Sequence, residues 1–331
     1  MDRGAVNNIS QIGFETTPGT AVSANRFIPT LSWMLKRERD TKKFRAHGAK
    51  VDTSHVVHKQ MSRGSVEGVL DYNSFPYLCE GLFNSASAVQ IGAITAFTRE
   101  YIPGVRTADS TPKTYTVESG DATACEDYAF TQLLSLAIEA GQDEFTVKSD
   151  AIARAPVDNQ SLSGSITSVA ERPVERNDIN VYINDDFATI GTTKISQALS
   201  ESINLGNKFK EFFVHNTATA EFADIVEIPY EPTFSFETVH NTQSRSLIAA
   251  ISSNPYKWIR WQALGASLGT HSAIERFETI QFDMCVKFDT PEKIEDEDGP
   301  LGYKYNCTMM PDMAGIGGYM KITSINALTA L

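Results

Sequence analysis

The sequence has little of what marks metal-binding, secreted and membrane-spanning proteins. It has only 4 cysteines in 331 residues and no CxxC pair, which argues against a zinc ribbon and a disulfide-rich scaffold. No apolar run approaches the roughly 18 residues that a membrane helix needs. The first residues are polar, so we expect no secretion signal. These absences predict reduced thiols in a chain that folds in the cytoplasm, with two disulfides as the alternative.

Positive charge is also scarce. The chain has 29 basic and 41 acidic residues, a formal net charge of −12, and a pI near 5.0. This balance argues against a protein that grips nucleic acid by neutralising its phosphates. A hydrophobic content of 41% and a charged content of 21% are those of an ordinary folded protein. The length allows one large β unit or two modest ones.

Charge is unevenly distributed along the chain. Residues 36–63 hold nine basic side chains against three acidic ones, a balance of +6, and an acidic loop precedes Gly299 and Pro300. Both segments are solvated surface in the simplest interpretation. A nucleic-acid arm at 36–63 is a weaker alternative, because the segment has little aromatic content. The third alternative is a complementary pair of surfaces that meet between subunits.

Apolar and polar residues alternate along much of the chain, which predicts strands. Residues 233–239 and 278–288 are the clearest examples, and 180–186 is predicted to be a strand that returns through 187–191. Helix signals are limited to 75–83 and 243–251. The pattern predicts a mainly β (α+β) fold of antiparallel strands.

The two predicted helices lie in similar settings. Each follows an alternating strand and precedes a predicted long hairpin, at 132–150 and at 278–310. This similarity predicts a duplicated domain, with residues 1–175 forming the first copy and 176–331 the second. The alternative is one domain with insertions.

The sequence offers no motif that identifies an enzyme. It has no nucleophile elbow, P-loop, dinucleotide-binding glycine motif or HExxH pair. His55 and His58 have a metal-compatible gap but no further ligand nearby, so we expect no metal site. We also expect no enzymatic activity and no cofactor. An alternative function without catalysis is carbohydrate binding by a β-sandwich. The tryptophans that would line its sugar-binding face are Trp33, Trp258 and Trp261.

Several short segments, in order along the chain, resemble one family. Residues 11–22 read QIGFETTPGTAV, which resembles the G-x-E-T-T-P-G-T-A opening of major tail tube proteins from long flexible-tailed (siphovirus-type) bacteriophages. Residues 68–78 look like the strand-to-helix junction of that family, and 115–120 like its following strand. The segment 181–194, with Gly-Thr-Thr-Lys near its end, is similar to the family's mid-chain hairpin.

The resemblance implies a structural virion protein with the phage tail-tube fold. In that fold two roughly orthogonal, barrel-forming β-sheets pack beside a short flanking helix, and rings of such units stack into a hollow tube. DNA passes through the lumen into the host without specific binding. With two tube domains per chain, three chains would form a pseudo-hexameric ring. A hexameric ring of single-domain chains is the alternative.

The implied partners are other copies of the chain and the tape-measure, tail-terminator and distal tail proteins, with no membrane involved. The implied location is the virion tail, assembled in the host bacterial cytoplasm. We hypothesise that opposite charges help successive rings to dock. The candidate inter-ring contacts are Lys36, Arg37, Arg39, Lys42, Lys43 and Arg45 on the basic side, and Glu292, Glu295, Asp296, Glu297 and Asp298 on the acidic side.

Overall fold

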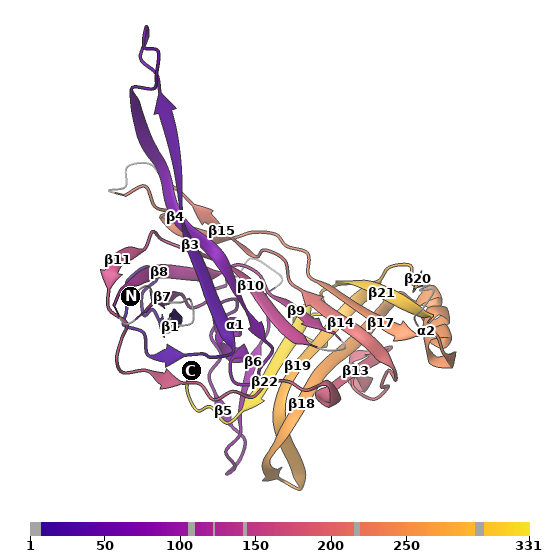
Figure 1. Ribbon diagram of the computed structural model, residues 1–331. Helices are drawn as coiled ribbons and strands as arrows, with labels where there is room; N and C mark the ends of the chain where they lie inside the picture. Colours follow the sequence, from indigo (N-terminus) through magenta and orange to yellow (C-terminus); the bar gives the residue numbers. More distant parts are fainter. Residues whose placement is uncertain (1–7, 105–109, 122, 142–143, 215–218, 295–300) are drawn as a thin grey trace.

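The computed structural model describes residues 8–104, 110–121, 123–141, 144–214, 219–294 and 301–331 (Figure 1). Strands make up 52% of the described residues and helical residues 8%, so the predicted mainly β fold is confirmed. The described residues contain two α-helices, α1 (Phe75–Glu80) and α2 (Thr242–Ser253), at the two predicted positions. The strands of the described residues do not close into a barrel.

The first half of the chain packs two antiparallel layers against each other. Strands β2, β1, β7, β8 and β11 form one layer, and β3, β4, β10 and β9 form the other. Trp33 and Tyr115 join the layers, with ring centroids 5.2 Å apart. The strands are β1 (Ile9–Phe14), β2 (Arg26–Phe27), β3 (Leu31–Phe44), β4 (Ser54–Val69), β5 (Val89–Gln90), β6 (Phe97–Tyr101), β7 (Tyr115–Gly120), β8 (Cys125–Leu133), β9 (Ala137–Ala140), β10 (Phe145–Ala153), β11 (Val157–Gln160) and β12 (Thr167–Ser168).

The second half also has two layers, β14–β17–β21–β20 and β13–β18–β19–β22. Phe236 of the first layer contacts Phe288 of the second, with ring centroids 6.1 Å apart. The elements are η2 (Arg176–Asp178), β13 (Ile179–Asn184), η3 (Phe187–Thr189), β14 (Ala198–Asn204), β15 (Phe209–Phe212), β16 (Asp224–Glu227), β17 (Thr233–Val239), β18 (Tyr256–His271), β19 (Ile274–Phe288), β20 (Glu292–Ile294), β21 (Gly302–Met309) and β22 (Met320–Asn326).

The two halves share strand pairings. β9 pairs with β14, and β6 crosses to pair with β22 of the second half. Between the halves, α1 has all six residues buried, and its Phe75 ring lies 5.8 Å from that of Phe282. The division of the chain at 175/176 therefore stays a prediction, and the two parts are linked by backbone hydrogen bonds and by core packing.

Burial explains the strands that the sequence predicts well. In β17, Phe234, Phe236 and Thr238 are buried while the residues between them are partly exposed, which is the period of two expected for a strand with one buried face. The four cysteines are buried and unpaired, in agreement with reduced thiols. Burial raises the pKa of the Cys79 and Cys307 thiols.

Some predicted local structure is wrong. Residues 187–191 do not form a returning strand, because Asp186 accepts a hydrogen bond from the Thr189 backbone amide (2.9 Å) and caps the short helix η3. The predicted hairpins at 132–150 and 278–310 are present in shorter form. The first is the pair β9–β10, and in the second β19 pairs with β21 at residues 286–288. The longest hairpins of the structure are β3–β4 and β18–β19.

Candidate assembly surfaces

The long hairpin β3–β4 projects from the body of the molecule (Figure 1). Only the root of β3 is packed, with Leu31, Trp33 and Leu35 buried, and every residue from Lys36 to Phe44 is exposed. We call residues 36–63 the arm. A two-stranded ribbon with no buried face is marginally stable in water, so its outer part gains little from its own chain.

The two faces of the arm differ in charge. Side chains alternate along a strand, so Arg37, Arg39 and Lys43 continue the face of the buried Trp33. Their β4 partners are Ser62, Gln60 and His55, so that this face has no acidic residue. Both acidic residues of β3, Glu38 and Asp40, point to the opposite face, together with Lys36 and Lys42.

Ion pairs occupy part of the predicted basic set. Arg37 pairs with Asp158 of the body and lies 3.9 Å from Glu126, and Arg45 lies 3.6 Å from Asp52 within the arm. The remaining four make no ion pair with any residue that the structure describes, and they are Lys36, Arg39, Lys42 and Lys43. These four are the basic residues left for a partner.

Of the predicted acidic set, the structure describes Glu292. Glu292 is in β20, opposite Lys304 of β21, and accepts a hydrogen bond from Asn306 (3.3 Å). The other four predicted residues, Glu295, Asp296, Glu297 and Asp298, lie outside the described residues. Figure 1 shows β20 and the arm at different ends of the molecule, so one chain does not bring Glu292 and the basic residues of the arm together.

A continuous sheet joins the arm to β20. Its strands run β3–β4–β10–β9–β14–β17–β21–β20, and within the described residues β3 pairs only with β4 and β20 only with β21. Both ends of this sheet therefore have an open edge.

One face of this sheet is solvated and polar. Residues directly opposite each other share a face, and one such row is Thr146, Glu139, Ser202, Ser235 and Asn306. Outside the arm, the charged members of the same face are Glu67, Glu139, Asp150, Glu237 and Glu292 against Lys148 and Lys304. We call it the polar sheet face. It is dominated by small polar side chains with an excess of carboxylates.

The segment that resembles the family's opening has a defined structural role. Glu15, which is buried, accepts hydrogen bonds from the Gly19 and Phe130 amides (2.7 and 2.8 Å) and from the Thr114 and Thr116 hydroxyls (2.7 and 3.0 Å). This carboxylate therefore clamps the loop 15–20 to β8 and to β7 and the residue before it. Gly19 has a φ of +79°, which favours glycine at this turn.

The residues of the alternative functions do not gather into a site. Trp33 and Trp261 are buried in the core, and the Trp258 indole donates to Asp312 (2.7 Å), so the tryptophans form no shared exposed platform. The part of the chain described here contains no cluster of three or more metal-ligating side chains. No helix among the described residues is long and apolar enough to cross a membrane.

The comparison with protein-family models finds no match, and a search of curated proteins finds none either. The assembly surfaces described above therefore rest on the geometry of this chain and on the resemblance of its short segments.

Proposed function

We propose that this protein is a structural subunit that assembles with copies of itself into the tail tube of a bacteriophage. The observation that carries the proposal is the arm, because a projecting, cationic hairpin whose outer part has no buried face needs a partner surface. The sequence segments that resemble tail tube proteins support the same function, including the Glu15 loop.

The open sheet edges support assembly in one direction. β3 and β20 lie at opposite ends of the same sheet, so copies arranged head to tail would bring the free edge of one beside the free edge of the next. The β9–β14 pairing inside the chain is a joint of this edge-to-edge kind. Such an arrangement would place Glu292 of one copy near the basic arm of another, which favours association electrostatically.

The polar sheet face supports a role as the wall of a conduit. Its small polar side chains offer few projections, and its excess of carboxylates repels DNA phosphates. A wall of this kind would let DNA pass without binding it. The location that follows from the proposal is the virion tail.

The test is negative-stain electron microscopy of the purified chain and of two charge-matched variants. The arm variant is Lys42→Glu/Lys43→Glu, and the control is Lys194→Glu/Lys287→Glu, whose two lysines are exposed and lie away from the arm. We expect rings or tubes with three-fold or six-fold symmetry from the wild type and the control, and none from the arm variant. A wild type that stays monomeric at every concentration would refute the proposal, as would normal tubes from the arm variant.

A further inference from the structure

A second hairpin supports the root of the arm. Strands β15 and β16 form a two-stranded sheet that pairs with no other strand in the described part of the chain. We call residues 208–214 and 219–228 the brace. Figure 1 shows β15 beside the root of the arm, although the two segments are far apart in sequence.

Three contacts join the brace to the arm. The backbone amide of Gln60 donates a hydrogen bond to the backbone carbonyl of Ala220 (2.9 Å), and the Arg63 side chain forms an ion pair with Glu211. The Lys59 ammonium lies 4.5 Å from the centroid of the Phe213 ring. These contacts hold β4 along its edge and on one face, at the point where the arm leaves the body.

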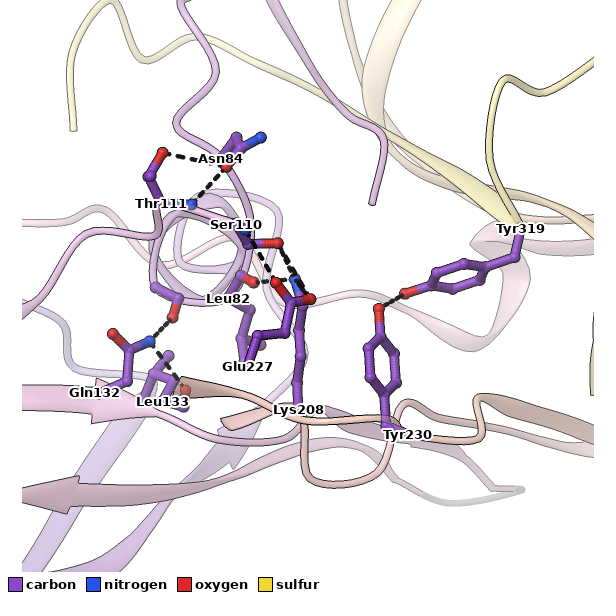
Figure 2. Close-up of polar contacts among 11 residues, drawn as sticks. Leu82, Asn84, Ser110, Thr111, Gln132, Leu133, Lys208, Glu227, Tyr230 and Tyr319 are labelled. Carbon is purple, nitrogen blue, oxygen red and sulfur yellow. Dashed lines mark hydrogen bonds and ion pairs between the residues drawn. The ribbon is translucent and has the colours of Figure 1, made fainter. Parts of the chain in front are cut away.

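The other end of the brace is held by a buried lysine. The Lys208 side chain is 3% exposed, and its ammonium donates to the Leu82 carbonyl (3.0 Å) and the Ser110 hydroxyl (2.7 Å). Its third partner is Glu227, at 3.4 Å, in β16 of the same brace. Figure 2 shows these groups converging on the lysine. An ammonium has three donors, and here each of them has a partner.

The surroundings of Lys208 suit an anchor. The rings of Phe83 and Phe209 lie 5.0 and 5.1 Å from its ammonium, and burial lowers the pKa of the lysine while Glu227 opposes that shift. Glu227 in turn accepts from the Ser110 amide (2.9 Å). The lysine therefore ties both strands of the brace to the segment after α1 and to the residues before β7.

We infer that the brace sets the direction of the arm and that Lys208 is a positioning residue that anchors one end of the brace. A two-stranded hairpin is not stable alone, so the brace keeps its place through contacts at both ends. At the end opposite Lys208, Phe222 is buried against Phe130 (ring centroids 5.2 Å apart) and Glu221 accepts a hydrogen bond from the Ala155 backbone amide (3.2 Å). The inference rests on the proposed function, because the direction of the arm matters where the arm docks on another copy.

The test measures hydrogen exchange at the backbone amide of Gln60, which donates to the carbonyl of Ala220 in the brace. Lys208→Met is compared with Lys210→Met, a control two residues further along, in β15, whose side chain is exposed. We expect Gln60 to exchange about tenfold faster or more in Lys208→Met. In Lys210→Met, exchange at Gln60 should stay at the wild-type rate. The backbone amides of β17 should remain protected in both variants. Wild-type exchange at Gln60 in a folded Lys208→Met protein would overturn the inference.

A second variant covers the case in which Lys208→Met unfolds the whole chain. Glu211→Gln/Phe213→Ala removes two brace-to-arm contacts and leaves the buried anchor intact. It should also speed exchange at Gln60, and no change there would overturn the inference. The proposed function is judged separately, by microscopy. Tubes from the Lys42→Glu/Lys43→Glu protein would refute that function, while the exchange result would still decide whether the brace acts on the arm.

Discussion

Glu15 is an example of one buried charge that organises several segments. Its two carboxylate oxygens accept four hydrogen bonds from the loop 15–20 and from the region of β7 and β8. These donors replace the water that the carboxylate loses on burial.

We therefore predict that Glu15→Gln destabilises the fold. A glutamine side chain has one acceptor oxygen, so about half of the donors lose their partner inside the protein, at an expected cost of about 3 kcal/mol. Denaturant unfolding measures this change against Glu231→Gln, which alters an exposed glutamate and should change the stability by less than about 0.5 kcal/mol. Equal stabilities of the two variants would contradict the proposed role of Glu15.

Glu201 gives the fold a dependence on pH. It is 9% exposed on β14, between Ala140 of β9 and Phe236 of β17, and burial raises its pKa from 4.5 to about 7. Arg176 and Lys194 line the same cavity of about 360 Å³. The folded state thus binds a proton more tightly than the unfolded state does, and stability falls as pH rises from about 4.5 to about 7.

The corresponding prediction concerns Glu201→Gln, which removes the titrating group and keeps its shape. Since one pKa unit is worth about 1.4 kcal/mol, the wild type should lose up to about 3 kcal/mol relative to the variant across this pH range. Unfolding free energies of both proteins at several pH values between 4.5 and 8 measure the difference. Parallel curves would show that the environment of Glu201 does not favour its protonated form.

Among the elements, the arm adds length without adding to the core. We predict that replacing residues 41–58 by an Asn-Gly turn, which joins the paired Asp40 and Lys59, leaves the stability of the body almost unchanged, because nearly all the side chains removed are exposed. The thermal midpoint should shift by a few degrees at most, and assembly into rings or tubes should be lost. Calorimetry and electron microscopy check the two parts. A shortened chain that still forms tubes would contradict the role of the arm.

The arm also shows why some elements escape sequence-based prediction. The 233–239 strand is predictable because it has one buried side with a period of two. The helix that begins at Phe75 is buried on all sides, and its signal is the run of apolar residues with Pro76 in the first turn. Beyond residue 35, β3 has no buried side, so alternation gives no signal there and charge is the visible feature. That charge identified the segment as a contact candidate, but it did not predict the hairpin.

The candidate surfaces were predictable to a similar extent. The basic set was placed on one structural element, but the pairing of Arg37 with Asp158 depends on residues more than 100 positions apart. The brace gave no signal, because a lone lysine such as Lys208 in a polar segment looks like a surface residue until tertiary packing buries it. The polar sheet face likewise appears only once the register of its strands is known.

At the scale of the whole molecule, the two halves depend on each other. β6 belongs to the first half in sequence but pairs with β22, and β14 completes the edge of β9. We predict that fragment 1–175 alone does not form a stable fold, since these edges would be exposed and α1 would lose the Phe75–Phe282 contact. Circular dichroism and size-exclusion chromatography test the fragment, and co-expression with 176–331 should restore a complex. An independently folded, monomeric 1–175 fragment would instead support two autonomous domains.

The β9–β14 pairing has a consequence for the speed of assembly. It forms when a single chain folds, so the two participating edges meet at an effective concentration of about millimolar order, set by the connecting chain. In a ring of the proposed kind, β9–β14 pairings within chains would alternate with β20–β3 pairings between chains. Half of the edge-to-edge pairings would therefore be complete before any two molecules collide. Only the joints between β20 and β3 would depend on protein concentration, so ring closure would take fewer encounters than a ring of separate single sheets requires.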